Sequence, residues 1–400
     1  MPLRIHLHDN SGHPFTIQLS RALAARGHQV LHTYMATFQS PKGQLEVAPG
    51  DAPTLRIEGI DLGGSFAKYS YWQRWQQERR YGAALARRLE EERPEVLLAC
   101  NTPPEMLEIV QRCCKRLGIR FVFWVQDLYG PAIRQILGGR YWGAGRLIAA
   151  HYERKEARLL RRSDQAVAIT EDFRSFLREA GLPDDRISVI GNWAPIEELP
   201  TRPRHNAWSR AQGLDEAFVF LYSGTLGLKH DPALLVMLAE AFRDDPQVLI
   251  AVVTEGIGAD WLRQACAEKG LHNLRLLPFQ PFEQMPEVLA SADVLVAMLE
   301  EGAGVFSVPS KILSYQCAGR PVLLSAPGEN QATKMIVAAD SGRVCPSADR
   351  QRFVDEARRL MADSQLRLQL GRNGRQFAES RFQIEAITGH FETILRKAVA

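Results

Sequence analysis

The segment LRIHLHDNSGHPFTIQLSRALAARGHQVLHTYM, residues 3–35, decides the class of fold. Apolar residues dominate its two ends, LRIHLHD and QVLHTYM, which predicts two strands. Between them, a loop at Ser11-Gly12-His13 leads into an amphipathic stretch that ends at Gly27, and this pattern predicts a helix. The segment therefore predicts a βαβ unit.

Strand and helix patterns continue to alternate along the chain. A Pro-rich, charged segment at about 194–217 lacks periodicity and predicts an interdomain linker. A second alternating series starts at FVFLYSGTLGLKHDPALLVMLAEAF, residues 218–242. Alternation of this kind is typical of parallel sheets that are covered by helices on both faces. We therefore expect an α/β protein with two Rossmann-like, doubly wound domains, at 1–200 and 201–379.

Composition narrows the classes of function. The chain has 400 residues, which suits two domains, and a net charge of +3, which argues against a dedicated nucleic-acid partner. The six cysteines include no CxxC pair, which suits a reducing compartment. The N-terminus lacks the apolar core of a signal peptide, and no run reaches the roughly 18–20 apolar residues of a spanning helix. We expect a cytoplasmic protein, soluble or peripheral to a membrane.

Motifs for cofactors and metals are missing from the sequence. No GxGxxG follows the first strand and no GxxxxGK[ST] is present, so neither a dinucleotide cofactor nor a P-loop is predicted. No cluster with metal-ligand spacing is found, so we expect no metal. His28, His32 and His151 stand apart from one another and are expected to be structural or surface residues.

The turn YSGTLGLKHDP, residues 222–232, is the first candidate site. A strand leads into Gly224-Thr225-Leu226-Gly227, followed by Lys229. In open α/β sheets, ligands bind outside the carboxyl ends of strands, and a Gly-rich turn with a lysine can bind phosphate there. The alternative is a structural turn with a solvated lysine.

The segment GVFSVPSKILSYQCAGRPVLL, residues 304–324, is the second candidate site. It predicts a loop, a short helix and a buried strand, with Lys311 in the first helical turn. The helix dipole is positive there, so a cation is unfavourable unless an anion offsets it. A surface lysine is the alternative. Two lysine-bearing turns in one Rossmann-like half favour a diphosphate clamp.

Three segments, SGTLGLKHDPALL, LPFQPFEQMPEVLASADVLVAML and GVFSVPSKILSYQCAGRPVLL, resemble glycosyltransferase family 4 in their order and spacing. The N-terminal GHPFTIQLSRALAARGHQV resembles the first βαβ unit of that family, so the resemblance covers nearly the whole chain. It implies the GT-B fold, in which two Rossmann-like domains face a cleft and a C-terminal helix, about 380–400 here, crosses back to the N-domain. The closest subgroup is the bacterial surface-polysaccharide transferases, such as those that add N-acetylfucosamine.

The resemblance also implies which residues meet the donor. Residues of the two lysine-bearing turns would lie at its diphosphate, and Lys229 and Lys311 would be the catalytic cations. Phe279 would lie where backbone meets the nucleobase, and Glu255 and Gly256 would border the same cleft. The donor-binding set also includes Gly224, Thr225, Gly227, Ser310 and Ser314.

One departure from the family concerns the donor sugar. Many members carry two glutamates eight positions apart, and here Phe306 and Ser314 stand in their places. On the acceptor side, Gly12 and His13 match the loop that approaches the donor. Asp127 is expected to be the acceptor base or a ligand of the acceptor hydroxyl, with a helix N-cap as the alternative.

The activity implied by the resemblance is a retaining sugar transfer from a nucleoside diphosphate sugar. The donor would be UDP-linked and could carry an N-acetylated amino sugar. Lysines and helix N-termini would stabilise the charge that grows on the β-phosphate. The alternatives are a nucleotide-sugar epimerase on the same fold, which would need an acid/base pair at the sugar, and an inactive nucleotide-sugar-binding member.

Two segments rich in basic and aromatic residues, 66–81 and 134–162, predict contact with a membrane surface. The second holds eight Arg or Lys against two Glu. Such segments suit an anionic bilayer, although a solvated helix face or a cleft for a free sugar acceptor would look similar. Contact with a membrane would fit a polyprenyl-pyrophosphate-linked acceptor, and we expect a peripheral protein at the inner face of the cytoplasmic membrane.

Overall fold

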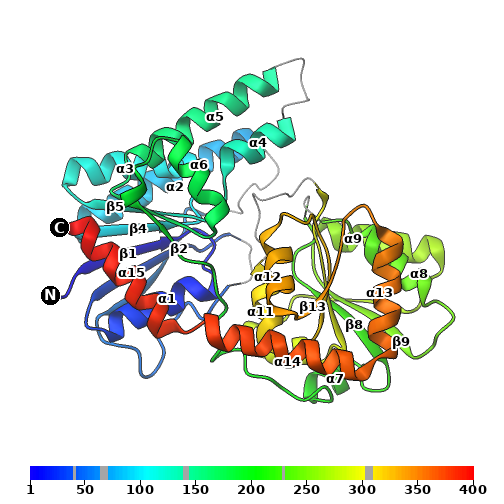
Figure 1. Ribbon diagram of the computed structural model, residues 1–400. Helices are drawn as coiled ribbons and strands as arrows, with labels where there is room; N and C mark the ends of the chain where they lie inside the picture. Colours follow the sequence, from blue (N-terminus) through cyan, green and yellow to red (C-terminus); the bar gives the residue numbers. More distant parts are fainter. Residues whose placement is uncertain (39–41, 64–70, 138–143, 228–229, 302–309) are drawn as a thin grey trace. The chain divides into compact units, whose positions relative to one another are not determined.

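The structure is a computed structural model that describes all of residues 1–400 except 39–41, 64–70, 138–143, 228–229 and 302–309 (Figure 1). The described residues form two compact units. The first unit is Met1–Asn192 together with Ile384–Ala400, and the second is Trp193–Gln383. Each unit holds one parallel sheet with helices on both faces, so the expected α/β class with two Rossmann-like domains is confirmed.

The first unit is built on a sheet of seven described strands in the order β3-β2-β1-β4-β5-β6-β7, all parallel. Its central strands read as apolar runs because helices cover both faces. The strands are β1 (Arg4–Asp9), β2 (Gln29–Met35), β3 (Leu55–Ile60), β4 (Val96–Cys100), β5 (Arg120–Val125), β6 (Gln165–Ala168) and β7 (Ile187–Val189).

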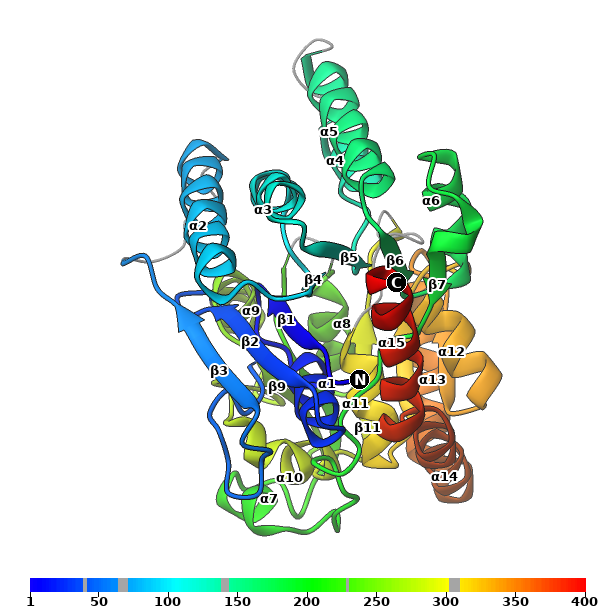
Figure 2. The same cartoon turned by 90° about the vertical axis from the view of Figure 1, so that its left-hand side faces the viewer.

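The helices of the first unit cover opposite faces of this sheet, with α1 and α15 on one face and α2 and α3 on the other (Figures 1 and 2). They are α1 (Pro14–Ala25), α2 (Tyr71–Glu92), α3 (Pro104–Leu117), α4 (Tyr129–Leu137), α5 (Ala144–Arg161), α6 (Glu171–Glu179) and α15 (Ile384–Val399). The ring of Phe391 on α15 lies 4.6 Å from the buried ring of Trp124 on β5. The expected return of the C-terminal helix to the first domain is therefore confirmed.

The second unit is built on a sheet of six described strands in the order β10-β9-β8-β11-β12-β13, also parallel. The chain order reverses between β8 and β11, which places the topological switch point of the sheet between these two strands. The strands are β8 (Phe218–Ser223), β9 (Val248–Val253), β10 (Leu274–Leu277), β11 (Val294–Met298), β12 (Val322–Ser325) and β13 (Gly342–Cys345).

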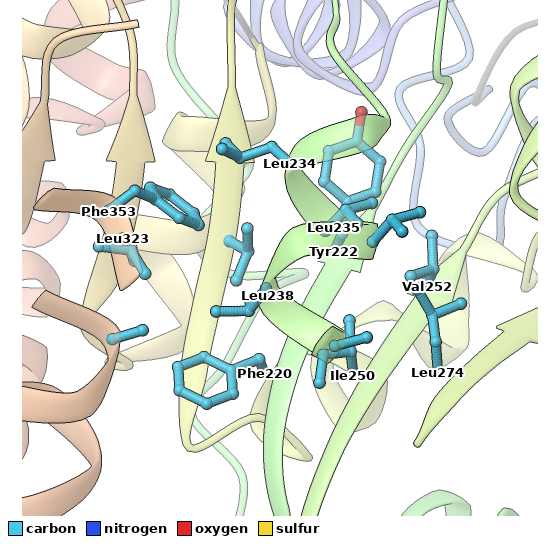
Figure 3. Packing of buried hydrophobic residues seen from close by; sticks show 14 of the residues in the cluster. Phe220, Tyr222, Leu234, Leu235, Leu238, Ile250, Val252, Leu274, Leu323 and Phe353 are labelled. Atoms are coloured by element: carbon cyan, nitrogen blue, oxygen red, sulfur yellow. The ribbon is translucent and has the colours of Figure 1, made fainter. Parts of the chain in front are cut away.

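Two apolar cores sandwich the second sheet. Successive side chains of a strand point to opposite faces of the sheet. On β8, Phe220 and Tyr222 therefore face one core, while Val219 and Leu221 face the other. Figure 3 shows the first core, where the ring of Tyr222 lies beside apolar side chains and its hydroxyl oxygen points away from them. The helices of this unit are α7 (Ala207–Ala211), α8 (Ala233–Ala241), α9 (Ile257–Lys269), α10 (Met285–Ala290), α11 (Ser310–Ala318), α12 (Gln331–Ala339), α13 (Arg350–Ala362) and α14 (Ser364–Arg381).

Part of the segment that we expected to be a linker, 194–217, is folded into the second unit. Helix α7 begins with a capping box in which Asn206 and Ser209 each bond the backbone N–H of the other at 2.9 Å. Trp208 is only 6% exposed and belongs to the second core. The capping box and the burial of Trp208 stabilise α7. The weak periodicity of the segment did not indicate this helix.

Candidate functional site

The candidate site of the second unit lies at the carboxyl edge of its sheet, at the switch point. Gly224 follows β8 directly, and Ser310 and Lys311 open α11, which follows β11 in the chain. Ligands of open α/β sheets bind at this place. The topology thus brings the described residues of the two turns, 224–227 and 310–311, to one edge of the sheet.

Lys311 crosses the turn after β8 in close contact with Gly224. A Cβ atom at Gly224 would lie 3.0 Å from Cε and 3.4 Å from Nζ of Lys311. The φ angle of Gly224 is +138°, a conformation that side chains with a Cβ rarely adopt. Glycine is therefore required here both by the backbone and by the lysine that lies over it.

The Nζ atom of Lys311 has two polar neighbours. It lies 2.5 Å from Oη of Tyr222, 4.1 Å from the centroid of that ring, and 3.4 Å from Nε2 of His230. Within the described part of the chain, no carboxylate forms an ion pair with it. Burial lowers the pKa of Lys311 to about 7. Among the described residues, the site therefore holds a buried lysine with no carboxylate beside it.

Hydrogen bonds around Lys311 also fix the turn itself. Oη of Tyr222 donates to the carbonyl of Thr225 at 2.8 Å, and the N–H of Gly227 donates to Nδ1 of His230 at 3.2 Å. The N–H of Gly224 donates to the carbonyl of Val253 at 3.0 Å. The N–H groups of both glycines therefore already have acceptors within the protein, and the amine of Lys311 is the polar group that lies across the turn.

Tyr315 anchors α11 to the sheet. Its buried hydroxyl accepts from the N–H of Ser223 at 2.9 Å and lies 3.3 Å from the carbonyl of Val296, so it joins the helix to both β8 and β11. Burial raises the pKa of Tyr315 well above its ordinary value. Because Tyr315 and Lys311 are four residues apart, they share one face of α11, and the anchor also orients the lysine.

Phe279, expected at the nucleobase, and Glu255, expected to border the same cleft, meet in the structure. The N–H of Phe279 donates to Oε1 of Glu255 at 3.0 Å, and Gly256, with φ of +86°, leads into α9. A Cβ atom at Gly258 would lie 2.4 Å from Cβ of Leu226. Gly258 thus lets the turn after β8 pack directly against the start of α9.

The other residues expected at the donor are placed as follows. Thr225 lies in the turn after β8 and is exposed. Ser310 is the exposed first residue of α11, and Ser314, one turn further along, is half-buried. Lys229 and Phe306 lie outside the described residues. Sequence reasoning did not assign Tyr222, His230 or Tyr315 to the site.

In the first unit, the candidate site centres on Asp9, the buried last residue of β1. Its carboxylate accepts hydrogen bonds from the N–H of Ser11 at 3.1 Å, the N–H of His13 at 2.6 Å and the hydroxyl of Thr16 at 2.7 Å. Burial alone would raise the pKa of Asp9, but the charge of His13 and these hydrogen bonds hold it well below its ordinary value. Asp9 therefore remains a carboxylate inside the unit.

Asp9 in turn holds His13, whose Nδ1 lies 3.1 Å from Oδ2 of the carboxylate. Burial alone would lower the pKa of His13, but Asp9 raises it above its ordinary value, and the charge of Asp127 contributes in the same direction. The structure thus brings His13 and Asp127, predicted from distant segments, into one electrostatic environment at the edge of the first sheet. Gly12 precedes them with φ of +72°.

Three other histidines of the first unit are buried and neutral. His6 and His8 share the hydroxyl of Thr33, at 2.8 and 3.0 Å, and His32 bonds the hydroxyl of Ser20 at 2.8 Å. Burial lowers the pKa of His8 to about 3 and that of His32 to about 4. These histidines are part of the core of the unit. In the described parts of the chain, no group of three or more His, Cys, Asp or Glu could hold a metal ion.

The described residues of segments 66–81 and 134–162 expose aromatic and aliphatic side chains beside basic ones. On α2, Trp72 is 66% exposed and stacks on Trp75 at 5.2 Å, and Arg79 lies 5.0 Å from the Trp75 ring. On α5, Leu147 is 75% exposed and Ile148 is 43% exposed. Among the described helices, none is long and apolar enough to cross a membrane.

The two-domain fold and the sequence matches define a class of protein, the GT-B glycosyltransferases. Residues 14–198 match the sequence model described as Glycosyltransferase Family 4, and residues 205–377 match the one described as Glycosyl transferases group 1. The two matches together span most of both units. The chain belongs to glycosyltransferase family 4 and has the GT-B fold.

A relative identified by sequence agrees with this assignment. The chain is 26% identical over 220 residues to WcaI of Escherichia coli (strain K12), which is named as a colanic acid biosynthesis glycosyl transferase. That match covers 53% of this chain and about half, 52%, of the relative.

Solved structures share the fold at low sequence identity. HepE of Anabaena, in complex with UDP and glucose, superposes with a TM-score of 0.71 at 17% identity, over 98% of this chain and 99% of its own. WaaG, a glycosyltransferase involved in lipopolysaccharide biosynthesis, gives 0.70 at 15% identity, over 98% and 99%. Sucrose-phosphate synthase of Thermosynechococcus elongatus gives 0.74 at 18% identity, over 98% of each chain.

Proposed function

We propose that the protein transfers a sugar, with retention of configuration, from a nucleoside diphosphate sugar to an acceptor in bacterial surface-polysaccharide biosynthesis. The donor is a UDP-sugar, which can carry an N-acetylated amino sugar, and the acceptor is a lipid-linked or glycan chain. The observation that carries the proposal is the amine of Lys311, held across the Gly224 turn with no carboxylate paired to it in the described residues. A diphosphate would supply the missing negative charge.

The same arrangement supports a role in the chemical step. When the sugar leaves the donor, negative charge grows on the β-phosphate. Lys311 and the N-terminus of α11 lie at one place and both favour negative charge there. Phe279 and Glu255, which bond one another at the ends of neighbouring strands, are proposed to border the nucleobase. UDP bound to HepE, a protein of the same fold, is consistent with this choice of nucleotide.

The acceptor side is assigned to the first unit. Asp127 is proposed to bind the acceptor hydroxyl or to take its proton, and His13, whose pKa is raised by Asp9, is proposed to attract an anionic acceptor when it is protonated. The exposed aromatic and basic residues of α2 and α5 support a membrane-surface location, because such side chains favour anionic bilayers. A polyprenyl-pyrophosphate acceptor would account for both His13 and the membrane-facing helices, because its pyrophosphate is anionic and its lipid stays in the membrane.

The test is a panel of nucleotide sugars incubated with the protein, with and without bacterial membrane extract, followed by measurement of released nucleoside diphosphate. Lys311→Ala is run beside the wild type, and Lys269→Ala is the matched control, because Lys269 is a lysine of the same unit that pairs with Glu240 at 2.7 Å. Release that needs both membranes and Lys311 supports the proposal. Conversion of the donor without release of nucleoside diphosphate would indicate an epimerase. Donor binding with neither conversion nor release would indicate a binding protein.

A further inference from the structure

Lys311 shares its surroundings with a second base rather than with an acid. Nδ1 of His230 accepts from the N–H of Gly227, so a neutral imidazole carries its proton on Nε2, the atom that lies 3.4 Å from Nζ of Lys311. Oη of Tyr222 gives its own proton to the carbonyl of Thr225 and is left as an acceptor at 2.5 Å from Nζ. These two partners determine which form of the lysine the site accommodates.

A neutral amine satisfies both partners, whereas an ammonium satisfies only one. A neutral amine has two N–H groups and a lone pair, so it can donate to Tyr222 and accept from Nε2–H of His230. An ammonium has three N–H groups and no acceptor, so its proton and that of Nε2 would face one another. We propose, building on the donor site above, that Tyr222 and His230 are positioning residues that hold Lys311 without its proton in the empty site, so that a nucleoside diphosphate binds together with one proton.

The charged groups on the elements packed around α11 do not oppose this state. On α14, Arg375 bonds the carbonyls of Cys317 and Leu199, and on α10, Glu287 accepts from the N–H of Trp208. Strand β11 contains no ionisable side chain, and Glu300 and Glu301, which follow it, are not among the causes of the pKa shift of Lys311. On α11 itself and on β8, Tyr315 and Tyr222 are neutral, since burial raises the pKa of both. Lys229 lies outside the described residues.

Burial, which lowers the pKa of Lys311 to about 7, agrees with the geometry. Diphosphate binding reverses this shift, because an anion beside the amine favours its charged form. Nζ then takes one proton from the buffer acid through its lone pair, which forms one N–H bond, and the buffer is left as its conjugate base. At pH 8 the empty site is mostly neutral, so binding takes up close to one proton, about one per UDP by linkage. At pH 6 the lysine is already protonated and contributes little uptake.

The experiment is calorimetric titration of the protein with UDP at pH 8, in Tris and in HEPES, whose different ionisation enthalpies report the protons taken up. UDP is fully ionised at this pH, because its terminal phosphate has a pKa of about 6. Lys311→Arg keeps the charge but cannot lose its proton, so it should bind UDP without this uptake. His230→Asn replaces the imidazole with an amide that does not titrate, and Tyr222→Phe keeps the ring but removes the hydroxyl. Far-UV circular dichroism verifies that both variants fold.

Two results support the proposal: an uptake of about one proton by the wild type that is absent in Lys311→Arg, and a smaller uptake in His230→Asn. Tyr222→Phe should lower kcat by roughly tenfold with a smaller effect on KM, because the amine loses the partner that places it. UDP binding that depends on Lys311 but shows equal uptake in wild type and Lys311→Arg would overturn this inference and leave the donor site in place. Failure of UDP to bind at all would overturn both.

Discussion

A Cβ atom at Gly224 would lie 3.0 Å from Cε of Lys311, although 86 residues separate the two in the chain. A contact of this length is tighter than nine in ten that real Cβ atoms make, so the lysine would have to shift by a few tenths of an ångström. The positive φ of Gly224 and the position of Lys311 over it therefore both favour glycine at 224. The fit links the position of the lysine to the conformation of the turn.

The first prediction concerns this fit. Gly224→Ala should weaken UDP binding at least about tenfold, because the new methyl group displaces Lys311 and strains a backbone with positive φ. Calorimetric titration with UDP measures the effect. Gly270→Ala is the control, since Gly270 also has positive φ, at +60°, but has no atom within 4 Å of a Cβ. It should lose about 1 kcal/mol of stability and bind UDP normally. Equal loss of UDP binding in both variants would refute the argument.

The second prediction concerns Asp9 and His13. Asp9→Asn removes the charge that stabilises the imidazolium, so the pKa of His13 should fall below its ordinary value, because burial then dominates. The pair stabilises the fold only while both groups are charged. Its contribution is therefore lost as pH rises through the raised pKa of His13, and lost again as pH falls through the lowered pKa of Asp9.

NMR titration of the His13 ring in wild type and Asp9→Asn measures this change directly. The substitution should also cost about 2–4 kcal/mol of unfolding free energy near pH 6, since a buried, charge-assisted network is broken. Thr16→Val, which removes one hydrogen bond to Asp9 but leaves its charge, is the matched variant and should keep the pKa of His13 raised. An unchanged His13 titration in Asp9→Asn would contradict the assignment.

The third prediction concerns acid sensitivity. His32 is buried and neutral with a pKa of about 4, so it binds a proton in the unfolded chain between about pH 6.5 and pH 4 but not in the folded one. The unfolded state therefore gains protons there, and stability falls as pH falls through this window. Between pH 7 and pH 5, His32 alone should cost about 2 kcal/mol of unfolding free energy.

Urea unfolding of wild type and His32→Asn at both pH values checks this. The variant should lose about 2 kcal/mol less than wild type on going from pH 7 to pH 5, even if it is less stable at both. His272→Asn is the control, because His272 is an exposed histidine of the second unit. If His32→Asn shows the same pH dependence as wild type, His32 is not held neutral by the fold.

The fourth prediction concerns the membrane surface. Trp72→Ser should lower binding to vesicles of anionic lipid by about tenfold, because a largely exposed indole no longer enters the headgroup region. Sedimentation with vesicles measures the bound fraction, and raised salt should weaken binding further. Trp261→Ser is the matched control, since Trp261 is 44% exposed but lies on α9 of the second unit. Equal effects of the two substitutions would exclude α2 as the membrane contact.

The sequence was sufficient to predict the fold because its strands read as apolar runs and its helices as amphipathic segments. It also indicated Gly224 and Lys311, since a glycine after a strand and a cation at a helix start conflict with local preferences unless a ligand is present. The edge strand β3 and the helix α7 were not predicted, because LRIEGI is half polar and AWSRA is short.

The partners of these residues could not be found from sequence. Tyr222 ends an apolar strand and reads as a core residue, and only its contact with Lys311, 89 positions away, gives it a polar role. Asp9 likewise reads as the polar end of a strand. Its role depends on burial together with the hydroxyl of Thr16 and the ring of His13, which a helical turn brings back to it. Long-range packing, rather than local pattern, determines both.

The most direct test of the proposed activity is transfer of a labelled sugar from UDP-sugars to butanol-extractable lipid in bacterial membrane extract, by wild type and Lys311→Ala. We expect label in the lipid fraction with wild type and a large loss of that label with Lys311→Ala, while Lys269→Ala behaves as wild type. Label that stays wholly in the aqueous fraction with every UDP-sugar, or that enters lipid equally with Lys311→Ala, would contradict the proposed activity.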